Sequence, residues 1–372
     1  MPLPEAARAE RAAWLRLALT PGVGPAAVRD LLSVFGLPED VLASGRPALG
    51  RVVGEKLAAA LAGPDERRDG EVEHALEWAR EPQHHLLSLA DAAYPARLLQ
   101  IGDPPPLLFV AGDPSVLQRP TLAIVGSRSA SRGGLETAEA FARALGDAGL
   151  TIASGLALGI DAAAHRGALA SAAGTVAVLG TGADVVYPHA HRDLADAIVR
   201  RGGAVVSELP LGTGPREANF PRRNRLIAGL SRGVLVVEAA LRSGSLITAR
   251  LAGEFGREVF AIPGSIHSPL AKGCHQLIKQ GAKLVESAQD VLAELSGLEP
   301  GPGSAPRPAA APPDPVLEAL GWDPVSAETL SRRLGGPQGT AGALAERLLA
   351  LEAEGRIERL HDGRYQRRGA PA

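Results

Sequence analysis

Arginine side chains crowd around one aromatic residue a little beyond the middle of the chain. Phe220 has four arginines within a few positions of it: Arg216, Arg222, Arg223 and Arg225. A guanidinium group binds phosphate through a planar fork of donors, and a phenyl ring stacks on any base. The combination favours single-stranded nucleic acid as a ligand. The alternative that these residues leave open is a solvated, arginine-rich start of a helix beside a core phenylalanine.

Four loops rich in small residues could complete such a site. Each follows a short apolar run typical of a strand, and in an open parallel sheet ligands bind beyond the carboxyl ends of the strands. Small residues there let phosphate approach backbone N–H groups at helix N-termini. We therefore expect an anion-binding rim, on which Arg128 is long enough to clamp a phosphate. The loop residues expected at this rim are Gly126, Ser127, Arg128, Ser154, Gly155, Gly180, Thr181, Ser243 and Gly244.

Titratable residues near the predicted strand ends leave an enzymatic interpretation open. Asp161 and His165 are four residues apart, and they are either an acid–base pair or a helix-capping residue and a helix-face residue. Asp184, Glu208 and Glu238 follow or end predicted strands, so cleavage of a glycosidic bond by carboxylates is conceivable. The competing function is therefore a nucleotide-processing α/β enzyme such as a phosphoribohydrolase.

Several other chemistries are disfavoured. The sequence has no Gly-x-x-x-x-Gly-Lys-Ser/Thr segment, which excludes nucleotide hydrolysis of the P-loop kind. The histidines at 189, 191, 267 and 275 lack metal-ligand spacing, so a metal site is not expected. Cys274 is the single cysteine, which excludes an intramolecular disulfide, and we expect it to be a buried small apolar residue.

Composition limits how the chain can attract a polyanion. Its 372 residues suggest two or three domains. Lys and Arg number 39 against 41 for Asp and Glu, so affinity for nucleic acid must come from local patches. The first twenty residues carry charges where a signal peptide has an apolar core, and the longest uncharged stretch, 167–183, is too short to span a membrane. A cytoplasmic protein is expected.

The central region, residues 83–297, repeats one unit of a short β-branched run, a glycine turn and a helical segment. This alternation indicates βαβ crossovers and a mostly parallel sheet covered on both faces. The predicted fold class is α/β, with an extended Rossmann-like sheet. The expected strands are 122–125, 150–153, 175–179, 204–206, 234–238, 259–262 and 283–285.

The two flanking regions are predicted to be small domains. Residues 1–82 form a helical domain of the helix-hairpin-helix or SAM-like kind, with a glycine hairpin at 19–27 and a polar loop at 63–70. Residues 298–313 hold six prolines and form a linker. Residues 314–372 contain three helices, at 316–320, 327–334 and 341–354, and then a hairpin around Asp362-Gly363, which predicts a winged helix. Ser326 is expected to cap the second of these helices.

The ordered motifs of residues 86–295 resemble the DNA-processing protein A (DprA) family, also called the Smf family. The resemblance rests on Gly126-Ser127-Arg128, Ser154-Gly155-Leu156-Ala157 with Gly159-Ile160-Asp161 and His165, Gly180-Thr181-Gly182 ending in Tyr187-Pro188, Asn219-Phe220-Pro221 with Arg223-Asn224-Arg225, and Ser243-Gly244-Ser245. It implies a non-enzymatic, homodimeric protein of natural transformation without a nucleotide cofactor. Such proteins bind and protect incoming single-stranded DNA and help to load the recombinase RecA.

The resemblance also implies roles for single residues. Arg128 would hold a phosphate and Phe220 would stack on a base. Further DNA contacts would come from His189, Asn219, Arg222, Arg223 and Arg225, together with the rim residues. The dimer surface would contain His275, Ile278 and Leu284. The chain departs from the pattern at His189, where many relatives have lysine, and at Glu217, where some relatives have a basic residue.

Overall fold

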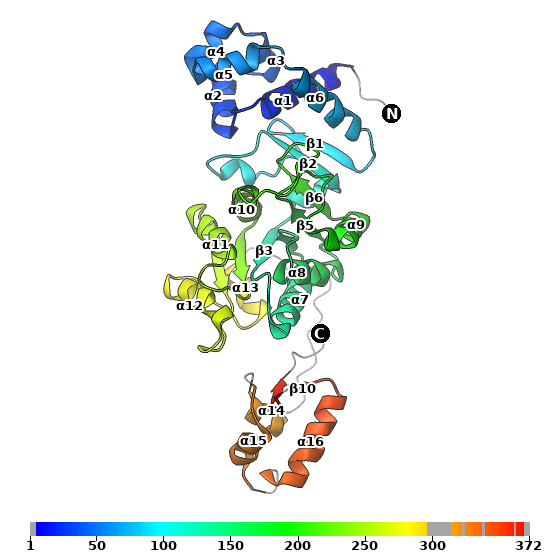
Figure 1. Cartoon of the computed structure of the whole chain (residues 1–372), viewed down its shortest axis with the longest axis vertical. Helices are drawn as coiled ribbons and strands as arrows, with labels where there is room; N and C mark the ends of the chain where they lie inside the picture. Colours follow the sequence, from blue (N-terminus) through cyan, green and yellow to red (C-terminus); the bar gives the residue numbers. More distant parts are fainter. Residues whose placement is uncertain (1–4, 296–313, 322–323, 337–338, 361, 368–372) are drawn as a thin grey trace.

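The computed structural model describes residues 5–295, 314–321, 324–336, 339–360 and 362–367. A group of short helices, a large sheet flanked by helices and a small C-terminal domain follow one another along the long axis (Figure 1). The predicted linker at 298–313 lies outside the described residues. No helix in the described part of the chain combines the length and the apolar character needed to cross a bilayer.

The N-terminal region is helical, as predicted. Gly22, at φ 83°, makes the glycine hairpin between the first two helices, and proline occupies the first turn of the second. The prediction of a loop at 63–70 is wrong in part, because Asp65 accepts a hydrogen bond from Arg68 N and caps a helix there. The helices are α1 (Glu5–Leu19), α2 (Pro25–Phe35), α3 (Pro38–Ala43), α4 (Arg46–Val53), α5 (Glu55–Ala62) and α6 (Glu66–Trp78).

The central sheet has nine strands in the order β1-β2-β6-β5-β4-β3-β7-β8-β9, and it is parallel from β6 to β9. This confirms the predicted α/β fold and the seven expected strands. The strands β1 and β2 were not predicted, and they add an antiparallel edge next to β6. The strands are β1 (His84–Ser88), β2 (Leu107–Gly112), β3 (Thr121–Val125), β4 (Thr151–Ser154), β5 (Thr175–Val178), β6 (Ala204–Ser207), β7 (Gly233–Val236), β8 (Glu258–Ala261) and β9 (Lys283–Leu284).

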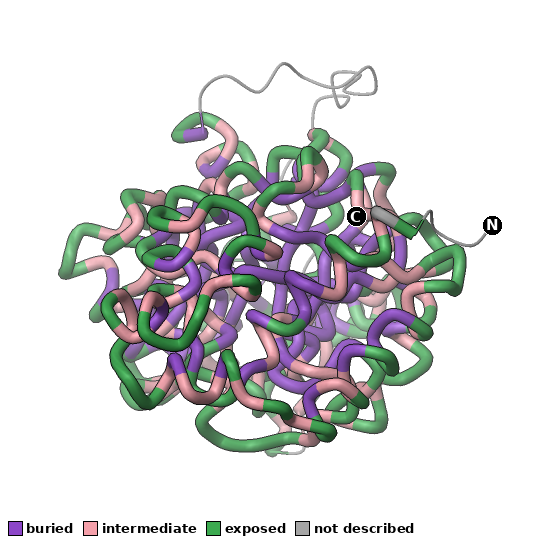
Figure 2. The backbone as a smooth tube through the Cα atoms, turned by 90° about the horizontal axis from the view of Figure 1, so that it is seen from above, coloured by how far each residue is buried: buried purple, intermediate pink, exposed green. Residues whose placement is uncertain are grey.

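Helices cover both faces of this sheet. Alternate residues of β3 point to opposite faces, so that Leu122 packs against α7 and α8 while Ala123 packs against α10 and α11. Buried backbone consequently runs through the middle of the molecule (Figure 2). The helices are α7 (Arg132–Asp147), α8 (Ile160–Leu169), α9 (Arg192–Arg200), α10 (Asn219–Leu230), α11 (Ser245–Glu254), α12 (Lys272–Lys279) and α13 (Ala288–Glu294), and the short 3₁₀ helices are η1 (Leu98–Gln100), η2 (Pro114–Gln118), η3 (His189–His191) and η4 (Pro269–Ala271).

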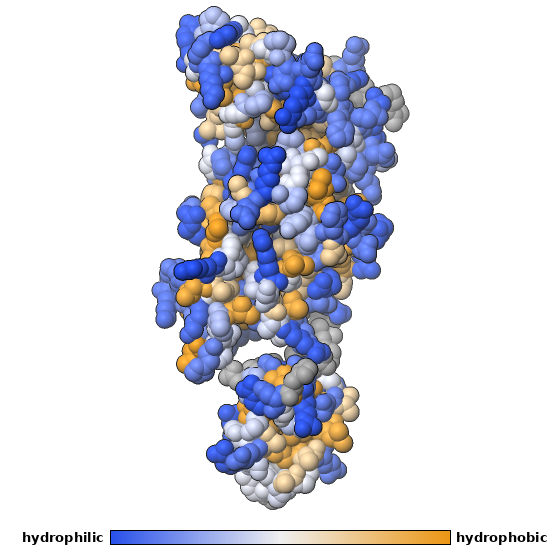
Figure 3. Space-filling view, viewed as in Figure 1, coloured by the Kyte–Doolittle hydropathy of each residue, from blue (hydrophilic) through white to orange (hydrophobic). Residues whose placement is uncertain are grey.

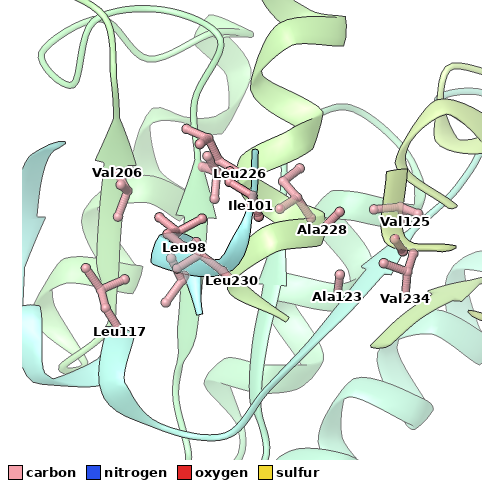
Figure 4. Packing of buried hydrophobic residues seen from close by; sticks show 14 of the residues in the cluster. Leu98, Ile101, Leu117, Ala123, Val125, Val206, Leu226, Ala228, Leu230 and Val234 are labelled. Carbon is pink, nitrogen blue, oxygen red and sulfur yellow. The ribbon is translucent and has the colours of Figure 1, made fainter. Parts of the chain in front are cut away.

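One face of α10 is buried in the largest core. Leu226 and Leu230 of this helix lie against Leu98 and Ile101, which come from η1 and the residue after it (Figure 4). Gly229 is needed in this contact, because a Cβ there would lie 2.8 Å from a methyl group of Leu98. The packing fixes the rotation of α10 about its own axis. That rotation decides which of its arginines reach the surface.

The N-terminal helices share a core with the antiparallel edge of the sheet. Phe109 of β2 meets the ring of Trp78 edge-on at 5.9 Å, and both belong to one cluster with the buried faces of α1 and α2. The helices therefore rest directly on β1 and β2.

The C-terminal region confirms the predicted three helices and hairpin. Ser326 accepts a hydrogen bond from Thr329 N and caps the second helix, as expected. A separate apolar cluster that includes Leu330, Leu348 and Leu351 holds these elements together. They are α14 (Pro315–Leu320), α15 (Ala327–Leu334), α16 (Ala341–Ala353), β10 (Ile357–Arg359) and β11 (Tyr365–Arg367).

Candidate nucleic-acid interface

The arginines of α10 divide between the surface and the interior. Arg222 has 51% of its side chain exposed, whereas Arg223 and Arg225 are buried. Arg216 lies on the exposed segment before the helix. Arg223 shares its helix face with Leu226, Ile227 and Leu230, which are three, four and seven positions further on. This spacing was a signal in the sequence that Arg223 faces the core.

Arg223 binds backbone groups at the carboxyl ends of β4 and β5 from inside the protein. Its Nη1 donates to the carbonyl oxygen of Gly155 at 2.7 Å and also to that of Val178. Burial lowers the pKa of Arg223 to about 10, against the opposing effect of the nearby Asp161 carboxylate, so the side chain stays charged at neutral pH. Gly155 is required here, because a Cβ would lie 2.3 Å from the guanidinium. The prediction of a direct contact between Arg223 and DNA does not fit this buried position.

Arg225 is likewise occupied inside the protein. Its Nη2 lies 2.5 Å from Glu208 Oε2, and its Nε lies 3.2 Å from Asp103 Oδ2. Arg222 Nη2 reaches the same Glu208 oxygen at 3.2 Å. Burial raises the pKa of Glu208, while Arg225 and Arg222 act to lower it. Arg225 thus belongs to a buried ion-pair network, and Arg222 remains at its exposed margin.

An exposed cation and two rings meet at the surface, and we call Arg128, Tyr187 and Phe220 the aromatic cluster. The Arg128 guanidinium carbon lies 5.5 Å from the centre of the Phe220 ring, and the Tyr187 ring lies 5.8 Å from Phe220, tilted by 41°. Tyr187 is 44% exposed. Gly180 makes room for Phe220, since a Cβ there would approach the ring to 2.7 Å. The cluster therefore offers a phosphate-binding group and aromatic surface together.

Tyr187 was not among the predicted DNA contacts. The sequence showed it only as the end of the motif that begins at Gly180, and nothing local indicated that it would lie beside Phe220. The signal that could have indicated Tyr187 was its position, as an aromatic residue in a loop that follows a strand of the same sheet.

The hydroxyl groups of the predicted rim point mostly inward. Ser154 donates to the Ile124 carbonyl oxygen and Thr181 donates to that of Val185, and both side chains are buried. Ser127 is also buried. At the outer positions, Gly244 and His189 are exposed, and Asn219 and Ser243 are partly exposed. The rim therefore presents side chains of Arg128, Arg222 and His189 rather than a row of hydroxyls.

Backbone amides of two loops also have partners within the protein. Gly155 N and Ala157 N donate to Asp161 Oδ2, at 3.1 and 3.3 Å. Ser127 N donates to the carbonyl oxygen of Glu238 at 2.7 Å. The expectation that Gly155 and Ser127 offer these amides to phosphate is wrong, because acceptors within the protein already hold them.

Comparison with known proteins identifies the family. A family model described as DNA recombination-mediator protein A matches residues 85–296, and a DprA winged helix domain model matches residues 299–363. The chain belongs to the DprA family. This confirms the resemblance seen in the motifs of the central region. It also assigns the C-terminal helices and hairpin to the winged helix domain of the family.

Relatives within the family cover most of the chain. Protein Smf of Escherichia coli K12 is 43% identical over 309 residues, which are 80% of this chain and 82% of that protein. DNA processing protein DprA of Streptococcus pneumoniae R6 is 52% identical over 208 residues, which are 56% of this chain and 73% of that protein.

Solved DprA structures share the fold. The X-ray structure of DprA from S. pneumoniae matches 76% of this chain and 95% of its own, with 42% identity and a TM-score of 0.65. A structure that describes the single-stranded DNA binding mode of DNA processing protein A from Helicobacter pylori matches 57% of this chain and 95% of its own, with 29% identity and a TM-score of 0.51.

The residues considered for an enzymatic role form hydrogen bonds within the protein. Asp161 accepts loop amides, and the Asp184 carboxylate accepts Gly212 N at 2.9 Å from each oxygen. His165 is buried, with its Nδ1 2.8 Å from Thr175 Oγ1. The acid–base interpretation of Asp161 and His165 is therefore wrong. Cys274 is buried, as expected, and burial raises its pKa to about 11. Across the described ranges, no three His, Cys, Asp or Glu side chains gather as a metal site requires.

The predicted dimer residues lie at the β9 side of the sheet. His275 and Ile278 are on α12, and the edge strand β9 that follows it carries Leu284, which is 42% exposed. His275 Nε2 lies 3.0 Å from the carbonyl oxygen of Gly264. The structure thus places these residues on two consecutive elements at one end of the sheet.

His165 gives the DprA fold a defined pH response. Burial lowers its pKa from 6.5 to about 3, so between these values the unfolded chain binds a proton that the folded chain does not. The free energy of unfolding therefore falls as the pH drops through this window, by up to about 1.4 kcal/mol per pH unit for one group. We expect His165→Asn to flatten the decline, measured by urea unfolding at several pH values between 7 and 4.5. The exposed His267→Asn is the control, and equal slopes for all three proteins would contradict the assignment.

Proposed function

We propose that the chain binds single-stranded DNA at the aromatic cluster and acts as a recombination mediator by positioning, without making or breaking bonds. The observation that carries the proposal is the exposed Arg128 guanidinium over the Phe220 ring with Tyr187 beside it. The H. pylori relative, whose structure describes a single-stranded DNA binding mode, supports the choice of ligand. Incubation with nucleoside monophosphates is expected to release no free base.

The binding mechanism follows from what each group can do. Arg128 neutralises a phosphate, Phe220 stacks on a base, and Tyr187 offers a second ring to the neighbouring base. Arg222 lies on the first turns of α10, exposed, and adds a second cation to the track of the backbone. Stacking needs unpaired bases, so the cluster discriminates between single strands and duplex without reading the sequence. The chain has slightly more acidic than basic residues, 41 against 39, and hydrophilic and apolar areas alternate over its visible face (Figure 3). This local patch must therefore supply the attraction.

Removing the Arg128 guanidinium is expected to weaken binding alike on oligothymidine and on mixed sequences. Loss of one phosphate contact lowers the slope of log affinity against log salt by about 0.7 for a single strand. Fluorescence anisotropy of labelled oligomers across a salt series measures this for Arg128→Ala. The matched control is Arg67→Ala, which changes an arginine of α6 whose side chain is 88% exposed. An unchanged slope in Arg128→Ala would reject a phosphate contact.

The two rings are expected to contribute stacking and no salt dependence. Phe220→Leu keeps an apolar side chain of similar size but removes the ring, and we expect binding to weaken by about 1–3 kcal/mol with the salt slope intact. Tyr187→Ala is expected to act in the same direction, whereas Tyr187→Phe retains the affinity. If Tyr187→Ala and Tyr187→Phe bind oligothymidine equally well, Tyr187 does not stack.

We propose also that two copies of the chain associate through α12 and β9. Leu284 is exposed on an edge strand that lacks a neighbour on its outer side in the described sheet, and the preceding helix α12 carries the partly buried Ile278. A dimer would let two sites engage one strand at high effective concentration. Leu284→Glu is expected to halve the mass measured by light scattering and to weaken binding to long oligomers more than to short ones. A wild-type protein of monomer mass at micromolar concentration would refute the dimer.

The last part of the proposed function is protection of the strand and delivery of RecA to it. It rests on membership of the recombination-mediator family. We expect the protein to shorten the lag before RecA assembles on single strands coated with single-strand-binding protein, as read from RecA ATP hydrolysis, and to slow nuclease digestion of those strands. Arg128→Ala should lose both effects. A variant that binds no DNA yet shortens the lag as well as wild type would show that delivery does not pass through this site.

A further inference from the structure

The order in which the chain adds strands to the sheet reverses at β3. From β3 to β6 the strands are added on one side, beginning with β4, and β7 is then added on the other side of β3. In doubly wound sheets this point opens a crevice, and phosphate groups of nucleotides bind there against the N-terminus of the helix that follows the first strand. In this chain that helix is α7, whose N-cap is Ser131. The place where a nucleotide phosphate would sit is therefore defined by the topology alone.

A carboxylate of the protein already lies at this place. Glu238 follows β7, and its Oε2 accepts Ser131 N at 2.8 Å while its Oε1 accepts Ser131 Oγ at 2.6 Å. Gly134, in the first turn of α7, makes room for it, because a Cβ there would lie 2.5 Å from the carboxylate. The negative charge thus rests against the positive end of the α7 dipole, where an external anion would be favoured.

The next strand and helix repeat the arrangement. Asp161, in the first turn of α8, accepts the amides of Gly155 and Ala157 in the loop after β4. It is buried, and the Arg223 guanidinium lies nearby as its counter-charge. Two adjacent loops that could hold phosphate are therefore both filled by carboxylates from the chain itself.

We propose that Glu238 is a built-in anion that occupies the phosphate position of the fold, excludes free phosphate and nucleotides from it, and thereby fixes the loop that presents Arg128. Asp161 acts in the same way at the following loop. The proposal concerns ligand selectivity. A free nucleotide cannot bind in the crevice, and a polynucleotide must be held by side chains outside it. Its second part, the effect on Arg128, rests on the proposed function.

Glu238 is placed to fix this loop at both ends. Its backbone carbonyl accepts Ser127 N at one end, and its carboxylate accepts Ser131 N at the other. Arg128 lies between them. A cavity of about 1060 Å³ borders both Glu238 and Ser131, so a small anion has a route to the position if the carboxylate is removed.

The first experiment asks whether the position takes phosphate once Glu238 is shortened. We expect Glu238→Ala to bind inorganic phosphate by calorimetry and to gain several degrees of thermal stability from it at constant ionic strength. Wild type and Glu258→Ala, which changes an exposed glutamate of β8, should show neither effect. Phosphate binding by wild type, or the same response in all three proteins, would overturn the proposal.

A second variant keeps the test decisive if Glu238→Ala does not fold. Glu238→Gln keeps the shape of the side chain and removes its charge, so the position stays filled. We expect it to be less stable than wild type and to gain nothing from phosphate. A gain of stability from phosphate in Glu238→Gln would show that phosphate binds elsewhere, and would overturn the proposal.

The second experiment separates the effect on Arg128 from a general loss of structure. Glu238→Gln is expected to weaken oligothymidine binding several-fold in the wild-type background and to have no further effect in Arg128→Ala. Equal losses in both backgrounds would overturn a role through Arg128. If Arg128→Ala alone leaves binding unchanged, the proposed function fails, while the phosphate measurement on Glu238→Ala still decides the first part.

Discussion

Two buried side chains of opposite charge at the carboxyl edge of the sheet, Arg223 and Asp161, hold the loops on which the surface depends. Taking a guanidinium and a carboxylate out of water is unfavourable, and it is tolerated only where hydrogen bonds satisfy both groups. Arg223 donates to the carbonyl oxygens of Gly155 and Val178, and Asp161 accepts the amides of Gly155 and Ala157. The pair therefore binds the loop after β4 to the end of β5. Losing either side chain would leave the other charge buried with less compensation, which is destabilising.

The helix α10 serves the interior and the surface at once. Its buried stripe joins Arg223 to the apolar residues that pack on the sheet, while Phe220 at its start and Arg222 remain near the solvent. The buried residues set the rotation of the helix, and this rotation brings Phe220 beside Tyr187 and under Arg128. A surface built in this way is rigid, because the same packing that buries the core face of α10 fixes the position of its exposed residues.

Internal carboxylates distinguish this sheet from nucleotide-binding sheets of the same topology. Glu238 accepts hydrogen bonds at the N-terminus of α7, and Asp161 accepts loop amides after β4. These are the groups that bind phosphate in nucleotide-binding sheets. The groups that we propose to bind DNA lie outside this crevice, on side chains that can follow an extended strand. In the proposed function, the protein holds a polymer at its surface, where nucleotide-binding sheets hold a small molecule in a crevice.

The sequence by itself determined the α/β class, the seven strands of the parallel part, the winged-helix elements and the family, because periodicity and ordered motifs are local along the chain. It also indicated Arg128 and Phe220 as a pair of complementary chemistry. Only the tertiary structure decided that Arg223 and Arg225 are buried, that Tyr187 lies beside Phe220, and that carboxylates occupy the loop amides. Glu238, for example, is 107 residues from Ser131, whose N–H and Oγ–H its carboxylate accepts. The spacing of Arg223 with Leu226, Ile227 and Leu230 indicated a shared helix face, but the groups that this face meets come from segments that only the fold brings together.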